Sequence, residues 1–137
     1  MENNFICSYA RTPIGAFQGS LSTIPATKLG SIAINGVLKK SGVNKKYIDE
    51  VIMGNVLSAN LGQAPARQAS IGAGLQNNVE CLTVNKVCGS GLKSIMLADD
   101  SIKSGNSDLI IAGGMESMSL APYYIENSRK GMMFGGN

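Results

Sequence analysis

The fold is decided by the stretch Cys81-Leu82-Thr83-Val84-Asn85-Lys86-Val87, which runs directly into Cys88-Gly89-Ser90-Gly91. Apolar and β-branched residues dominate the first seven positions and are typical of a β-strand. Beyond the glycines, apolar residues recur at helical spacing until Gly105, namely at Leu92, Ile95, Met96 and Ile102. The sequence therefore predicts a strand that turns sharply into a helix with one apolar stripe.

Further strands are predicted on both sides of this unit. Leu109-Ile110-Ile111-Ala112 is an unbroken apolar run that ends in Gly113-Gly114, and it is typical of a strand buried on both faces. Val51-Ile52-Met53 predicts an earlier strand, and Phe5 to Ala10 predicts the first one.

Two helices are predicted between these strands. One begins near Pro25 and ends at Gly42, with Lys39 and Lys40 in its last turn, where the helix dipole favours cations. The other has Pro65 in its first turn and stops around Gly72 and Gly74. Strands that alternate with helices predict an α/β fold with a mostly parallel sheet and flanking helices.

Composition narrows the functional classes. The chain has 137 residues, 44% hydrophobic and 15% charged, and its net charge of +3 is spread without a basic run, so we expect no nucleic-acid partner. No stretch is apolar for about 18 residues, and the start lacks the basic flank of a secretory signal. Together with three cysteines that lack zinc-site or disulfide spacing, this predicts a cytoplasmic protein without a metal site.

Cys88 is the main candidate for chemistry. It lies between a predicted strand and the amino terminus of a predicted helix, where backbone N–H groups and the helix dipole favour a thiolate. Gly89 and Gly91 leave room for a bulky acyl donor and expose N–H groups to an oxyanion. The alternative is a small buried hydrophobe, the usual role of a free cysteine, and position alone leaves both interpretations open.

No activating base for Cys88 can be named from the sequence. A helix terminus contributes about 0.3–1 kcal/mol, which leaves a thiol of ordinary pKa mostly protonated at neutral pH. The chain contains no histidine, Cys81 lies too far along the same predicted strand, and Cys7 is expected in the core. The segment Gly89 to Ser94 also resembles a dinucleotide-binding loop, although Ser94 occupies the third glycine position.

Several segments, in order along the chain, resemble the thiolase family and in particular its acetyl-CoA acetyltransferase branch. The segment 84–93 around Cys88 resembles the nucleophile segment of that family. The others are Arg11-Thr12-Pro13-Ile14-Gly15-Ala16-Phe17, Gly54-Asn55-Val56-Leu57, Gly62-Gln63, Pro65-Ala66-Arg67-Gln68 and Ala112-Gly113-Gly114-Met115-Glu116-Ser117-Met118-Ser119.

The resemblance implies that Cys88 takes an acetyl group from acetyl-CoA as a thioester, with its own backbone N–H as one oxyanion donor. A second acetyl-CoA then condenses with it to acetoacetyl-CoA, or the reverse thiolysis occurs, and no cofactor is needed. The family's catalytic histidine, second cysteine and water-positioning asparagine belong to later segments, so this chain alone is expected to be inactive. The alternative is a non-catalytic complementation fragment that binds the rest of the enzyme.

The resemblance also implies a domain organisation. Residues 1–119 are expected to form part of a thiolase N-terminal domain, incomplete as it stands, and residues 120–137 the start of the loop domain, with Tyr123 to Phe134 in tetramer contacts. A homodimer or homotetramer is implied for the parent enzyme. We expect Arg11, Gln63 and Arg67 to fix loops or subunit contacts, and the Glu116 carboxylate to order the loop that follows it.

Overall fold

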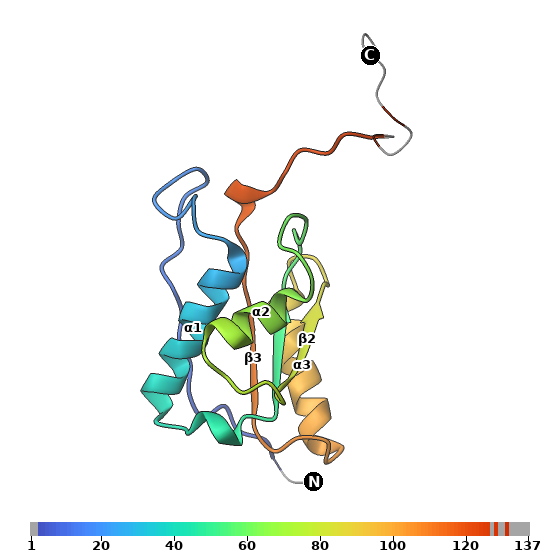
Figure 1. The fold of residues 1–137 in the computed structure, drawn as a ribbon. Coiled ribbons are helices and arrows are strands. Elements are labelled where there is room, and N and C mark those ends of the chain that lie inside the picture. Colours follow the sequence, from blue (N-terminus) through green and yellow to red (C-terminus); the bar gives the residue numbers. More distant parts are fainter. Residues whose placement is uncertain (1–2, 127, 129–130, 132–137) are drawn as a thin grey trace.

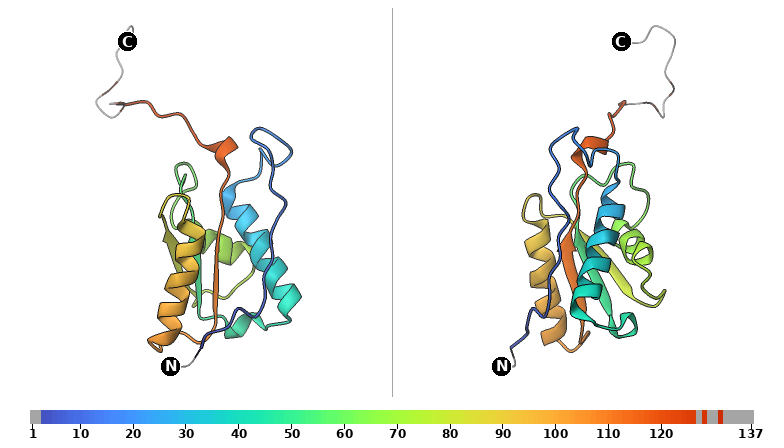
Figure 2. Two further views of the ribbon diagram at one scale, coloured as in Figure 1. Left: turned by 180° about the vertical axis from the view of Figure 1, so that it is seen from behind. Right: turned by 90° about the vertical axis from the view of Figure 1, so that its left-hand side faces the viewer.

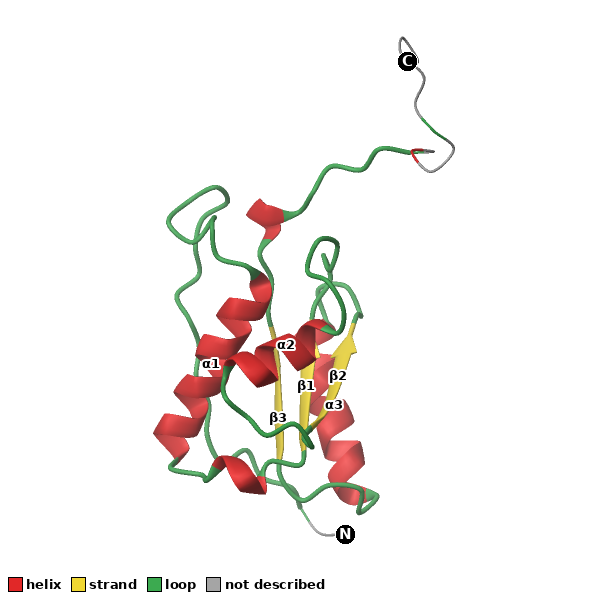
Figure 3. Ribbon diagram, viewed as in Figure 1, coloured by secondary structure: helices red, strands yellow, loops and turns green. Residues whose placement is uncertain are grey.

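The computed structural model describes residues 3–126, 128 and 131, and within them it shows a three-stranded parallel sheet. The strands are β1 (Glu50–Gly54), β2 (Glu80–Val84) and β3 (Ile110–Gly114), in the order β2-β1-β3 (Figures 1 and 3). The strands alternate with helices, as the sequence predicts. The α/β class and the parallel sheet with flanking helices are confirmed.

The helices cover the two faces of the sheet unequally. Helices α1 (Ala26–Ser41) and α2 (Pro65–Gly72) contact each other and lie on one face, whereas α3 (Ser90–Lys103) lies on the other (Figure 2). The buried hydrophobic cluster lies between the first face and the α1–α2 pair, and it includes Ile34 from α1 and Val51 from β1. The main core of the described residues is therefore on the α1–α2 side.

Local signals define α1 and α2 as predicted. Pro25 is the residue before α1, and Gly42 ends it with φ 71, a left-handed conformation that glycine adopts without a steric penalty. Lys39 and Lys40 lie in the last turn of α1, and Pro65 is the first residue of α2, where its missing N–H costs no hydrogen bond.

Helix α3 begins and ends close to the predicted positions, but most of its apolar stripe does not contact the sheet. Leu92, Ile95 and Met96 are exposed, and the residues that α3 buries are Ser90, Ser94 and Ala98. At the first turn of α3 the cause is space, because Gly54 and Gly114 of the sheet lie so close to Ser90 and Gly91 that a larger side chain would not fit.

Two strand predictions also need correction. Strand β2 ends at Val84, three residues before Val87, because Asn85 starts a turn in which its side-chain Oδ1 accepts a hydrogen bond from the Val87 N–H at 2.9 Å. Strand β3 is half-buried along most of its length and includes Gly113 and Gly114, so it is not the strand buried on both faces that its apolar run predicts.

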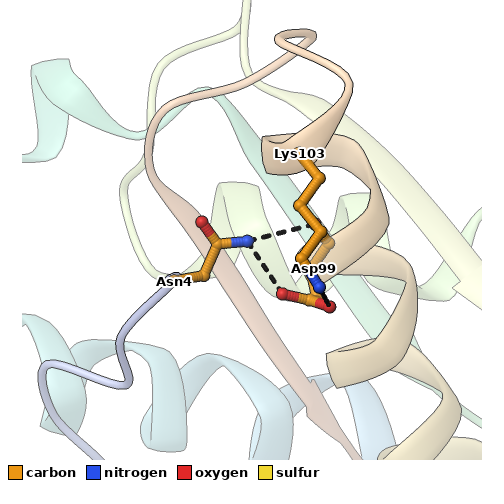
Figure 4. A network of polar contacts seen from close by, with 3 residues as sticks. All are labelled: Asn4, Asp99 and Lys103. Carbon is orange, nitrogen blue, oxygen red and sulfur yellow. Dashed lines mark hydrogen bonds and ion pairs between the residues drawn. The ribbon is translucent and has the colours of Figure 1, made fainter. Parts of the chain in front are cut away.

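The predicted first strand, Phe5 to Ala10, is wrong: this segment has no strand pairing and runs extended along the molecule. Side chains hold it instead, because the Asn4 amide donates to the Asp99 backbone carbonyl (3.1 Å) and carboxylate (2.8 Å) on α3 (Figure 4). Lys40 lies 3.6 Å from the centroid of the Tyr9 ring. A strand needs backbone partners, and no described segment supplies them here.

The described end of the chain leaves the body of the molecule. After the short helix η2 (Met118–Leu120), residues 121–126 run outward, and Tyr123 and Tyr124 are exposed (Figure 1). The predicted tetramer segment continues through residues that lie outside the described ones, including Phe134. No described helix is long and apolar enough to span a membrane.

Candidate active site

The site lies where the three parallel strands end. Gly54 is in register with Val84 on one side and with Gly114 on the other, so the residues that follow the strands meet at one edge of the sheet. The Asn55 N–H donates to the Val84 carbonyl at 3.0 Å, and the Met115 N–H donates to the Gly54 carbonyl at 2.9 Å. The carboxyl edge of a parallel sheet is where α/β proteins bind ligands.

Glycines let the first turn of α3 sit directly on this edge. A Cβ at Gly54 would lie 2.6 Å from the Ser90 carbonyl carbon and 2.7 Å from the Gly91 nitrogen, closer than real side chains approach. A Cβ at Gly114 would lie 3.4 Å from the Gly91 Cα. The close approach brings the residues just before α3, including Cys88, over the ends of the strands.

The turn between β2 and α3 is fixed at both ends by side chains. The Ser90 hydroxyl accepts a hydrogen bond from the Lys86 N–H at 2.8 Å and donates one to the Val87 carbonyl at 2.6 Å. Val87 has φ 48, a left-handed conformation that is a genuine outlier for a β-branched residue. A residue next to Cys88 is thus held in a strained conformation by its neighbours.

Cys88 itself is exposed and lies two residues before the first residue of α3. The first-turn N–H groups of a helix have no acceptors within the helix, and their dipoles favour an anion nearby. Cys88 also lines a cavity of about 770 Å³. Within the described residues the thiol is accessible rather than buried, and the arrangement suits attack by a sulfur on an acyl group that enters the cavity.

Most of the remaining cavity wall comes from three other segments, residues 10–17, 54–57 and 114–119, and part of it from residues at and before α1, namely Leu21, Ser22, Leu29 and Ala33. The first of these segments is tied to the third, because the Ser119 hydroxyl accepts from the N–H of Gln18, the residue after Phe17, at 2.9 Å. The Ser117 hydroxyl donates to the Ile24 carbonyl at 2.9 Å. The loop before α1 and the loop after β3 therefore form one wall.

Glu116 lies two residues after β3, and its side chain binds the loop after β1. Its Oε1 accepts from the Asn55 Nδ2 (3.0 Å) and the Leu57 N–H (3.2 Å), and its Oε2 accepts from the Val56 N–H (2.9 Å). The expectation that Glu116 orders the loop following it is corrected, since these bonds order the loop after β1. With both oxygens engaged, this carboxylate is not placed as a proton acceptor for the thiol.

The remaining candidates lie away from Cys88 or hold loops. Arg67 donates to the Val79 and Asn77 carbonyls, each at 2.8 Å, as expected of a loop-fixing residue. Cys81 is half-buried in β2, and Cys7 is exposed, so the expectation that Cys7 is a core residue is wrong. Neither cysteine lines the cavity. Among the described residues, no three metal-ligating side chains come together.

Gln63 takes part in loop fixing through its backbone, because its carbonyl accepts from the Gln68 side chain at 2.7 Å. Arg11 lines the cavity. Ser94, which occupies the third glycine position of the dinucleotide-loop interpretation, is buried, and its hydroxyl donates to the Gly91 and Gly113 carbonyls and so links α3 to β3.

Three residues of the site were not identified from the sequence: Asn55, Asn85 and Ser90. Asn85 could have been found, since an asparagine directly after a strand often starts a turn by bonding two residues ahead. Asn55 carried no such local signal, because its partners Met115 and Glu116 lie about sixty residues away.

Comparison with known proteins agrees with this arrangement. The family model described as the thiolase N-terminal domain matches residues 4–137. Acetyl-CoA acetyltransferase 2 of Arabidopsis thaliana is 59% identical over 130 residues, which is 95% of this chain and 32% of that protein. The mitochondrial acetyl-CoA acetyltransferase of Homo sapiens is 54% identical over 131 residues, covering 96% of this chain and 30% of the relative.

A solved thiolase structure also matches this chain. The Acat5 thiolase from Ascaris suum in complex with coenzyme A matches 97% of this chain and 34% of that chain, with a TM-score of 0.91 and 40% sequence identity. The chain thus spans about a third of the length of the relatives it matches. By motif, fold and similarity, the chain belongs to the thiolase family and matches the N-terminal portion of its members.

Proposed function

We propose that Cys88 is the acyl-accepting nucleophile of an acetyl-CoA acetyltransferase. The observation that carries the proposal is the exposed thiol at the amino end of α3, beside a cavity at the carboxyl edge of the sheet. The relatives named acetyl-CoA acetyltransferase and the coenzyme A complex of the Ascaris thiolase support this choice of substrate.

In the proposed reaction, the Cys88 thiolate attacks the carbonyl carbon of acetyl-CoA. The carbonyl oxygen becomes an oxyanion that faces the Cys88 N–H, and the C–S bond to CoA breaks to give acetyl-Cys88 and the CoA thiolate. A second acetyl-CoA, deprotonated at its methyl carbon, then attacks the acetyl carbon. Acetoacetyl-CoA forms, the Cys88 thiolate leaves, and the two CoA thioesters are the only substrates needed.

We propose that full turnover requires groups beyond these 137 residues. The chain contains no histidine, and Glu116, the acidic residue of the cavity wall, already accepts three N–H bonds. A base for the thiol and an acid–base pair for the substrate methyl must come from elsewhere in an active protein. In this organisation residues 1–119 belong to the N-terminal domain, residues 120–137 begin the loop domain, and the active parent is a homodimer or homotetramer.

A cytoplasmic location is part of the same proposal, since three free cysteines suit a reducing compartment. Some relatives carry the word mitochondrial in their names, so fractionation of cells that express the protein is the direct test.

Mass spectrometry of the intact chain after incubation with acetyl-CoA tests the nucleophile. One acetyl group on Cys88, absent in Cys88→Ala and removed by added CoA, is the expected product. Acetylation at Cys7 or Cys81 instead would contradict the assignment. Cys7 is a useful internal control because its thiol is also exposed but lies outside the cavity.

A second candidate is a complementation fragment that acts only by binding the rest of a thiolase. The exposed apolar residues of α3, Leu92, Ile95 and Met96, favour it because they offer a surface for further chain. Co-expression with a carboxy-terminal thiolase piece separates the two candidates. Thiolysis that returns with wild-type chain and not with Cys88→Ala supports catalysis by Cys88, whereas equal recovery with both supports a purely structural role.

A further inference from the structure

Glu116 connects the ends of β1 and β3 by an unusual number of hydrogen bonds. Both carboxylate oxygens accept N–H groups from the loop after β1, at 2.9 to 3.2 Å from Asn55, Val56 and Leu57. Hydrogen bonds to a charged acceptor are stronger than neutral ones, so this carboxylate fixes the loop firmly.

The same loop is held from the opposite side by the turn that carries Cys88. The Asn85 Nδ2 donates to the Val56 carbonyl at 3.4 Å, the longest bond of the set, while the Asn85 Oδ1 accepts from the Val87 N–H at 2.9 Å. Val56 is thus bound at its N–H by Glu116 and at its carbonyl by Asn85. A continuous path of hydrogen bonds leads from Glu116 to the residue before Cys88.

We propose that Glu116 is a positioning residue for Cys88, and that it acts through Val56 and Asn85. Glu116 holds the loop that Asn85 binds, and Asn85 holds Val87 in its left-handed conformation. Val87 in turn sets the orientation of Cys88 before α3 begins. The inference deepens the proposed function, since it concerns the thiol that would accept the acyl group.

Glu116→Gln tests the proposal because glutamine has the same shape and only one acceptor oxygen. Both oxygens of Glu116 accept N–H groups, so in the variant an NH₂ group faces at least one N–H donor. The variant breaks the path at its start without creating a cavity.

Two measurements on the full chain test whether the effect of Glu116→Gln reaches Val87 and Cys88. Amide hydrogen exchange by NMR should become faster at Val56 and Leu57, and also at Val87, which is bonded to Asn85 and not to Glu116. Alkylation of Cys88 by iodoacetamide at pH 7 should slow by about two- to fivefold, the size of the effect a helix terminus has on a nearby anion. Alkylation does not require acyl transfer, so this result stands or fails independently of the acetyl-CoA reaction.

Controls separate positioning from general destabilisation. Glu80→Gln, at an exposed glutamate of β2, should change neither measurement. Cys81 is half-buried, so partial unfolding would raise its alkylation, whereas positioning changes Cys88 alone. Faster exchange at Val56 and Leu57 with Val87 and Cys88 unchanged would overturn the proposal.

Asn85→Ala cuts the path at its middle and serves if Glu116→Gln unfolds. It should slow the alkylation of Cys88 and leave Leu57 exchange unchanged, because Glu116 still holds that amide. The double variant should alkylate Cys88 no more slowly than the slower single variant, since residues on one path are not additive. Unchanged alkylation in Asn85→Ala, or additive losses in the double variant, would also overturn the proposal.

Discussion

The helices on the two faces of the sheet contribute side chains of different size. On the α1–α2 face, large apolar side chains such as Ile34 and Met53 are buried. On the α3 face, the helix contributes small residues such as Ser94 and Ala98 and exposes large ones such as Leu92, while the sheet contributes the fully buried Ile52. The α1–α2 side holds the main hydrophobic cluster, and the small residues of α3 allow the close approach that brings Cys88 to the strand ends.

The largest difference is expected when the same substitution, isoleucine to alanine, is made in α1 and in α3. Ile34→Ala should lower the free energy of unfolding by about 2–5 kcal/mol, because it empties a fully buried position. Ile95→Ala should cost under about 1 kcal/mol, because Ile95 is 40% exposed. Urea denaturation of both variants measures the difference, and equal losses would mean that the outer face of α3 is covered in solution.

The next largest difference in stability is expected when a glycine of the sheet is replaced by alanine. Gly54→Ala places a Cβ against the backbone of Ser90 and Gly91, and we expect a loss of about 1–3 kcal/mol. Gly113→Ala places its Cβ 3.5 Å from the Met53 sulfur, an ordinary contact, and should cost less. Denaturation midpoints test this, and a tolerated Gly54→Ala would show that α3 is not seated as closely as described.

Two fully buried serines give a smaller and sharper comparison. The Ser94 hydroxyl donates to the Gly113 carbonyl at 2.7 Å, so Ser94→Ala should cost about 1 kcal/mol. The Ser70 hydroxyl on α2 has no partner among the described residues, so Ser70→Ala should be neutral or stabilising. Thermal unfolding distinguishes them, and a large loss in Ser70→Ala would indicate a bound water or another partner.

The smallest effect concerns the exposed end of α3. The hydrogen bond from Lys103, followed by that from Asn4, holds the pKa of the Asp99 carboxyl below its usual range, and the same bond raises the pKa of Lys103 (Figure 4). The Asp99 contribution is therefore present above its unfolded pKa and lost as the pH falls through the folded one. The Lys103 contribution is lost as the pH rises through its raised pKa.

Titration of the Asn4 side-chain amide by NMR between pH 2 and pH 6, in roughly the range where carboxylates protonate, measures this contact. Its signal should shift on the acid side in the wild type and lose that shift in Asp99→Asn. Global stability should change little, because the ion pair is exposed.

Local signals predicted much of this molecule, and long-range pairing explains most of what they missed. Pro25, Gly42 and Pro65 act on their own neighbours, so the ends of α1 and α2 could be predicted from the sequence. The segment from Phe5 to Ala10 looked like a strand, but a strand also needs a backbone partner that no local pattern reveals.

The same distinction holds at the site. The position of Cys88 at a strand–turn–helix junction could be predicted because glycines and helical spacing surround it in sequence. The role of Glu116 could not, because its partners after β1 are about sixty residues away. The exposure of the stripe on α3 could not be predicted, because helical periodicity reveals that a face is apolar, not whether it meets the sheet.

The left-handed Val87 has a consequence for attempts to improve this protein. A β-branched residue in that conformation stores strain, which glycine or asparagine would release. A screen that rewards thermal tolerance alone would therefore favour replacing Val87, and the more flexible turn would no longer hold Cys88 in one direction. Laboratory evolution of this chain should accordingly select on thiol reactivity and heat resistance together.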